Sequence, residues 1–126
     1  MKPISRNMTI AEMTRHFGVT ARSLRFYEEL DLLNPARHGN RRVYRPSDQR
    51  ALALIMVAVS HGLTLKEIRR DYFPGDEAII VPHRMLADRV RKLEKASKDA
   101  LRMAATIQQT LLASSGAGLV AIKVQE

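Results

Sequence analysis

Apolar residues recur with helical spacing along most of the chain, and helix-capping sequences mark where the segments begin. The string TIAE at residues 9–12 fits a capping box, and Gly18 can take the left-handed conformation that ends a helix. We therefore predict a helix over about 9–16. Thr20 is placed to cap a second helix over about 21–30, so the two segments predict a helix-turn-helix.

The second predicted helix separates apolar from basic positions. Leu24 and Tyr27 fall on a common stripe, whereas Arg22 and Arg25 point away from it. Pro35 then disfavours further helix, and a Gly-Asn turn at 39–40 lies between extended-type residues. This pattern predicts an inner side that packs, an outer side that binds a partner, and a two-stranded wing with its tip near 38–41.

The third predicted helix, over about 48–61 with Ser47 as its cap, has almost no polar face and should form the buried centre of the domain. Gly62 ends it. The string TLKE at 64–67 is a second capping box that opens a short fourth helix. Residues 1–72 thus form one predicted domain.

The remaining residues predict a connection, a long helix and a tail. Residues 73–82 are a predicted linker, in which 78–81 form either a short strand or an apolar patch on the domain. Residues 83–113 predict one long helix whose apolar seam alternates in steps of four and three: Leu86, Val90, Leu93, Ser97, Ala100, Ala104, Ile107 and Leu111. A lone helix cannot bury such a seam, so we expect a second copy of the chain as its partner. The alternative is a helix folded back on its own domain. Residues 114–126 form a predicted tail or one edge strand.

The composition favours an anionic partner. The chain has 126 residues, 45% of them hydrophobic, and a formal net charge of +8. Residues 1–72 hold 13 Lys or Arg against 7 Asp or Glu, and every such cation between 22 and 50 is an arginine, which suits bidentate phosphate or guanine contacts. Nucleic acid is therefore the leading candidate partner. An ordinary solvated basic surface is the alternative.

Other classes of function have little support in the sequence. The chain has no cysteine, which excludes disulfides and thiolate metal sites, and its four histidines are scattered without ligand spacing. No paired carboxylates, Ser/His/Asp arrangement or Gly-rich phosphate loop suggests an enzyme. We expect no metal and no cofactor. Without a signal peptide or a membrane-spanning segment, the expected location is cytoplasmic, associated with the nucleoid.

Three strings occur in the order found in the MerR family of bacterial transcription regulators, which this chain resembles. They are TIAEMTRHFGVTARSLRFYEELDLL at 9–33, GNRRVYRPSDQRAL at 39–52 and HGLTLKEI at 61–68. The resemblance covers about 9–70 and extends in type to the long helix. It implies a mainly α fold, with a winged helix-turn-helix domain followed by a long dimerisation helix that forms an antiparallel coiled coil in the dimer.

The resemblance also implies a function. A dimer would bind promoter DNA whose polymerase elements are too far apart, and bending or untwisting the duplex would realign them, with RNA polymerase as a candidate partner. The implied DNA contacts are Thr20, Arg22, Arg25, Phe26, Tyr27, Arg42, Tyr44 and Lys66, to which we add Arg41 on charge grounds. The implied dimer contacts are the seam residues Leu86, Val90, Leu93, Ala100, Ala104, Ile107 and Leu111.

The chain departs from the family pattern in three ways. Asp31 replaces a helix-ending glycine, which aspartate tolerates because it can enter the left-handed region. Cysteine is absent, and no effector domain follows position 113, so we expect a short member without one. Two other functions are open: an architectural or excisionase-like DNA-binding protein, and a coiled-coil protein-interaction module.

Overall fold

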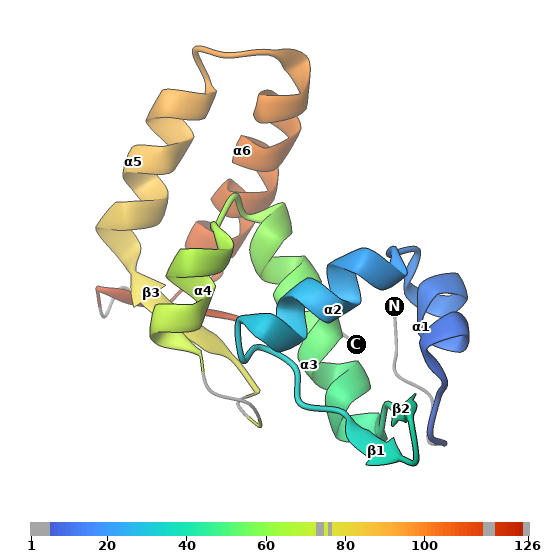
Figure 1. Ribbon diagram of the computed structural model, residues 1–126. Helices are drawn as coiled ribbons and strands as arrows, with labels where there is room; N and C mark the ends of the chain where they lie inside the picture. Colours follow the sequence, from blue (N-terminus) through green and yellow to red (C-terminus); the bar gives the residue numbers. More distant parts are fainter. Residues whose placement is uncertain (1–5, 73–74, 76, 115–117, 125–126) are drawn as a thin grey trace.

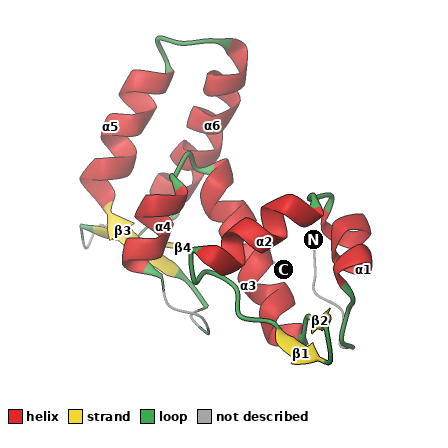
Figure 2. Ribbon diagram, in the orientation of Figure 1, coloured by secondary structure: helices red, strands yellow, loops and turns green. Residues whose placement is uncertain are grey.

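The computed structural model describes residues 6–72, 75, 77–114 and 118–124 (Figures 1 and 2). Its elements in chain order are α1 (Ile10–Phe17), α2 (Ala21–Glu29), β1 (Ala36–His38), β2 (Arg41–Val43), α3 (Pro46–Ser60), α4 (Leu65–Asp71), β3 (Ile79–Pro82), α5 (His83–Leu93), α6 (Lys98–Leu112) and β4 (Leu119–Ile122). The fold is mainly helical, as predicted. None of the described helices has the length and apolar character needed to cross a membrane.

Helices α1 and α2 form the predicted helix-turn-helix. Thr9 Oγ1 accepts a hydrogen bond from the Glu12 amide at 3.2 Å, and Glu12 Oε1 accepts one from the Thr9 amide at 3.0 Å, which completes the capping box. Gly18 ends α1 with a φ of 69°. Thr20 caps α2 by accepting a hydrogen bond from the Ser23 amide. These purely local signals are confirmed.

Helix α3 is the predicted buried centre of the fold, but its first turn differs from the prediction. The helix begins at Pro46 with Arg45 as its N-cap, so Ser47 is not the cap. Proline is favoured at the first helical position because it lacks the amide that would otherwise be unpaired there. Asp48 Oδ2, in the first turn, accepts a hydrogen bond at 2.7 Å from the backbone amide of the N-cap residue Arg45.

Strands β1 and β2 form the predicted two-stranded antiparallel hairpin. Arg37 pairs with Arg42 and His38 with Arg41, which leaves Gly39 and Asn40 at the turn. Met8 extends this hairpin on the other side through two backbone hydrogen bonds of 2.8 Å with Tyr44. This third segment was not predicted.

Strands β3 and β4 form a second antiparallel pair that joins the two ends of the C-terminal half. Ile79 pairs with Ile122 and Val81 with Val120, and these four side chains are buried. Of the alternatives left open by the sequence, the structure thus has the short strand within the predicted linker, at 79–82, and the edge strand within the predicted tail, at 119–122. Residues 73, 74, 76, 115–117, 125 and 126 of the predicted linker and tail lie outside the described residues.

In the single chain, residues 83–113 form two helices instead of the predicted single helix. The chain reverses at residues 94–97, and α5 and α6 pack side by side as a helical hairpin that projects from the rest of the molecule (Figure 1). Leu86, Val90, Ala104 and Ile107 of the predicted seam are buried within one chain. Of the other predicted seam residues, Leu93, Ala100 and Leu111 are half-buried, and Ser97, in the turn, is exposed.

The hairpin forms because the seam can pair with itself. A turn of four residues brings the apolar stripe of α5 against that of α6 at a small loop-closure cost, whereas a partner chain must be recruited from solution. The charges beside the turn also stabilise the two helix ends. Arg91 and Lys92 lie in the last turn of α5 and Asp99 in the first turn of α6, and each charge interacts favourably with the dipole of its helix.

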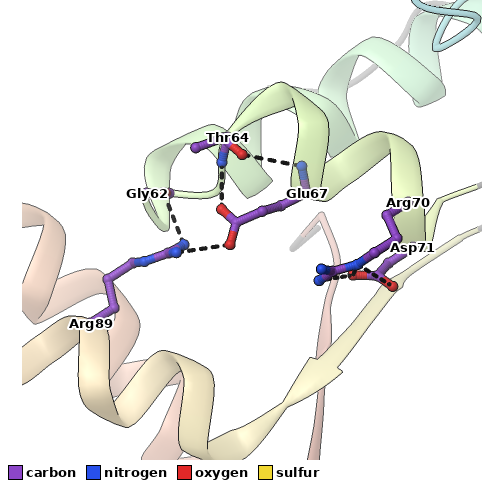
Figure 3. Close-up of polar contacts among 6 residues, drawn as sticks. All are labelled: Gly62, Thr64, Glu67, Arg70, Asp71 and Arg89. Atoms are coloured by element: carbon purple, nitrogen blue, oxygen red, sulfur yellow. Dashed lines mark hydrogen bonds and ion pairs between the residues drawn. The ribbon is translucent and has the colours of Figure 1, made fainter.

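Arg89 connects the α5–α6 hairpin to α4 and to the turn that precedes it (Figure 3). Arg89 of α5 donates a hydrogen bond to the Gly62 carbonyl at 3.0 Å and another to Glu67 Oε2 at 2.9 Å. Glu67 Oε1 also accepts the Thr64 amide at 2.8 Å and so completes the predicted capping box of α4. The Arg89 guanidinium, first by its hydrogen bond, lowers the pKa of Glu67. The same carboxylate thus caps α4 and anchors α5.

Candidate nucleic-acid interface

The outer face of α2 presents basic and aromatic side chains to solvent. Leu24, on the inner face, is fully buried and fixes the orientation of the helix. Arg22, Arg25 and Phe26 are exposed, as helical spacing from a buried Leu24 requires. An exposed phenylalanine, with 46% of its surface accessible, beside two arginines can contact sugar and phosphate groups together.

The remaining two predicted contacts on α2 are partly structural. Tyr27 is half-buried and packs against the core, so only part of its ring can face a ligand. Thr20 is exposed, and its hydroxyl donates a hydrogen bond to Ser23 Oγ at 2.9 Å while it caps the helix. Thr20 therefore positions the first turn, from which Arg22 projects.

The β1–β2 hairpin adds a second basic surface. Arg37, His38 and Arg41 are exposed around the turn, where Gly39 has a φ of 64°. Arg42 lies on the same strand as Arg41 but is only 22% exposed at its side chain. The hairpin thus carries arginines in two different environments.

Tyr44 is not on the surface, which corrects the expectation of a direct contact with DNA. Its side chain is fully buried, and its hydroxyl donates a hydrogen bond to Glu28 Oε2 at 3.2 Å. Burial raises the pKa of this phenol, and the negative charge of Glu28 acts in the same direction. Tyr44 therefore acts as a structural hydrogen-bond donor beneath the candidate interface.

Glu28 of α2 was missed by the sequence analysis. The Oε2 atom that accepts the hydrogen bond from the Tyr44 hydroxyl also accepts one from Arg42 Nε at 2.6 Å. Arg37 Nη2 lies 3.8 Å from Oε1. The carboxylate therefore joins α2 to both strands of the hairpin. Its signal was the LRFYE string itself, in which an acidic residue directly follows two aromatic residues within a basic segment.

Lys66 is exposed in the first turn of α4, at a distance in the chain from the other candidate residues. Helix α4 and the end of α2 are joined by an ion pair of 3.5 Å between Arg69 and Asp31. Asp31 adopts a φ of 61°, which confirms that aspartate replaces the helix-ending glycine in the left-handed conformation. Because both charges are well exposed, this pair contributes little stability.

A hollow of about 810 Å³ lies elsewhere, between α3, α6 and β4. Its histidine, His61, has both ring nitrogens in hydrogen bonds, Nδ1 with the Val57 carbonyl at 2.8 Å and Nε2 with Thr110 Oγ1 at 2.7 Å. Because both ring nitrogens are bonded within the protein, His61 has a structural role in this hollow. Among the residues that the structure describes, no group of three potential ligands could hold a metal ion.

Comparison with known proteins agrees with the geometry of the N-terminal half. Residues 8–70 match the model of the MerR HTH family of regulatory proteins. This match spans half of the chain and contains α1, α2, the hairpin, α3 and nearly all of α4. No solved structure matches the chain. The chain therefore belongs to the MerR family of helix-turn-helix regulatory proteins.

Proposed function

We propose that the protein is a sequence-specific transcription regulator that binds promoter DNA as a dimer and bends or untwists it. The observation that carries the proposal is the pairing of two basic surfaces: the outer face of α2 with Arg22 and Arg25, and the hairpin with Arg41. The bonds from Glu28 to Arg42 and Tyr44 hold these surfaces together.

The proposed contacts divide by chemistry. A helix-turn-helix places its second helix in the major groove, so Arg22 and Arg25 of α2 are positioned for base edges or phosphates. Arg41 on the hairpin and Lys66 on α4 would contact the backbone on either side. Such a spread of phosphate contacts favours a deformed duplex, because bending, at a cost of a few kcal/mol, brings more phosphates within reach.

The substitution Arg25→Ala tests the DNA contact. We expect weaker binding to duplex DNA and a log–log salt slope reduced by about 1, because one phosphate or base contact is lost. Arg84→Ala, which removes an exposed arginine from α5, is the matched control and should leave both quantities close to wild type. Equal affinities and slopes for the two variants would remove α2 from the proposed interface.

Dimerisation needs the α5–α6 hairpin to open, because the predicted seam is occupied within one chain. The heptad spacing continues unbroken through the turn, from Leu93 through Ser97 to Ala100, although a closed hairpin does not require this. The turn sequence Glu-Lys-Ala-Ser also contains no glycine or proline and includes strong helix formers. These features support a continuous helix that pairs with the same helix of a second copy and buries the same residues.

The substitution Lys98→Pro separates the two arrangements. Lys98 is the first residue of α6 and follows an extended Ser97 with ψ of 172°, a setting that proline favours. In a continuous helix the same proline would break the backbone bonding. We expect Lys98→Pro to remain a monomer in sedimentation equilibrium, whereas Lys98→Ala dimerises like wild type.

A dimer of Lys98→Pro as strong as that of Lys98→Ala would refute hairpin opening. A wild-type chain that stays monomeric at all concentrations would refute the dimer itself. Footprinting distinguishes the architectural alternative: protection between promoter elements supports a regulator, and tandem sites at a recombination sequence support an excisionase-like protein.

A further inference from the structure

Glu28 is an acidic residue within the surface proposed to bind DNA. Charge alone would make it unfavourable there, since a carboxylate repels phosphates. Its side chain is only 17% exposed, and the neighbouring Glu29 is exposed on the same helix. The two carboxylates are therefore adjacent in sequence but lie in different environments.

The contacts of Glu28 all reach the hairpin. Arg42 and Tyr44 donate to a single oxygen, Oε2, and Arg37 approaches the other oxygen. Arg37 and Arg42 are register partners on opposite strands. One carboxylate thus holds both strands and the residue that follows them.

The hairpin needs such an anchor. Its strands have three residues each, and a two-stranded hairpin of this size is at best marginally stable by itself. On one side the backbone bonds between Met8 and Tyr44 hold it to the N-terminal segment. On the side of α2, the hydrogen bonds from Arg42 and Tyr44 and the ion pair with Arg37 connect the hairpin to Glu28.

We propose that Glu28 is a positioning residue for DNA binding, which sets the hairpin at a fixed distance and angle from α2. The inference rests on the proposed function. Glu28 engages only Nε of Arg42, and a guanidinium has four further N–H donors, so Arg42 can hold Glu28 and a phosphate at the same time. Arg41 would then reach the same duplex as Arg22 and Arg25.

The test compares Glu28→Gln with Glu29→Gln, because each substitution removes one negative charge from adjacent positions of α2. Affinity is measured by fluorescence anisotropy on a labelled mixed-sequence duplex of roughly 30 base pairs, between about 50 and 200 mM salt. Charge alone predicts slightly tighter binding for both variants. Positioning predicts roughly tenfold weaker binding for Glu28→Gln, as a charge-assisted pair of bonds is replaced by neutral ones.

Two further measurements separate positioning from a general loss of stability. Hydrogen exchange of the hairpin amides should accelerate in Glu28→Gln and not in Glu29→Gln, while the amides of the α3 core remain protected. Arg41→Ala should also weaken DNA binding less in the Glu28→Gln background than in wild type, because a loosened hairpin has already lost that contact.

Tyr44→Phe serves if Glu28→Gln does not fold. It removes one of the two donors and keeps the buried ring, so binding should weaken about two- to threefold with faster hairpin exchange. Equal DNA affinity and equal hairpin exchange in Glu28→Gln and Glu29→Gln would overturn the inference while leaving the proposed function intact. A wild-type chain with no salt-dependent binding to any duplex would overturn the proposed function, and the inference with it.

Discussion

Replacing Arg89 by methionine should weaken the attachment of the helical hairpin to α4 without removing the aliphatic stem of the side chain. Two charge-assisted hydrogen bonds would be lost, to the Gly62 carbonyl at 3.0 Å and to Glu67 at 2.9 Å. The Arg89 and Glu67 side chains are 23% and 20% exposed, so solvent screens part of the interaction. We expect the free energy of unfolding to fall by about 1–2 kcal/mol at neutral pH.

The loss should depend on pH because Glu67 is charged only in part of the range. Its pKa in the folded protein is lowered by Arg89, so the ion pair stabilises the fold fully above the unfolded pKa of about 4.3. This contribution disappears as the pH falls through the lower, folded pKa. The difference in stability between wild type and Arg89→Met should therefore shrink in acid.

Urea unfolding followed by far-ultraviolet circular dichroism measures this difference, at low protein concentration, from neutral pH to below about pH 4. Arg84→Met is the matched control, because Arg84 is an exposed arginine on the same helix. The reasoning fails if Arg89→Met is no less stable than Arg84→Met, or if their difference is the same in acid as at neutral pH.

Two further substitutions test the packing of the same region. Gly62→Ala should destabilise the fold by more than about 1–2 kcal/mol, because Gly62 has a φ of 82° and an added Cβ would lie 2.7 Å from Met103 Sδ. Gly18→Ala is the control for backbone strain alone, because Gly18 has a φ of 69° and nothing lies near its added Cβ. Ile107→Ala should cost about 2–5 kcal/mol in urea unfolding, since Ile107 of α6 is a fully buried core residue. Leu101→Ala, at a 44% exposed position of the same helix, should cost much less, and equal losses would contradict the assigned burial.

Local signals in the sequence were sufficient for the N-terminal half. The capping residues Thr9, Thr20 and Thr64, the turn glycine Gly18 and the left-handed Asp31 act through neighbours within a few positions. Their structural effect does not depend on distant residues. The helix-turn-helix, the hairpin and the family could therefore be predicted from the order of the residues alone.

The C-terminal half shows the limit of periodicity. Periodic apolar spacing predicts that one stripe of the helical segment is buried. The structure buries four residues of that stripe, Leu86, Val90, Ala104 and Ile107. Periodicity does not state which surface covers the stripe, because a second copy and a reversed chain satisfy it equally well. For that reason the single chain forms two helices, α5 and α6, where the sequence predicts one.

The candidate interface divides in the same way. The sequence by itself determined that Arg22, Arg25 and Arg41 are exposed, since helical and strand spacing around buried neighbours directs these side chains outward. Only the tertiary structure decided that Tyr44 is buried and that Glu28 receives both Arg42 and Tyr44. Those contacts join residues 14 and 16 positions apart, and a hydrogen bond across that separation depends on how helix and hairpin pack.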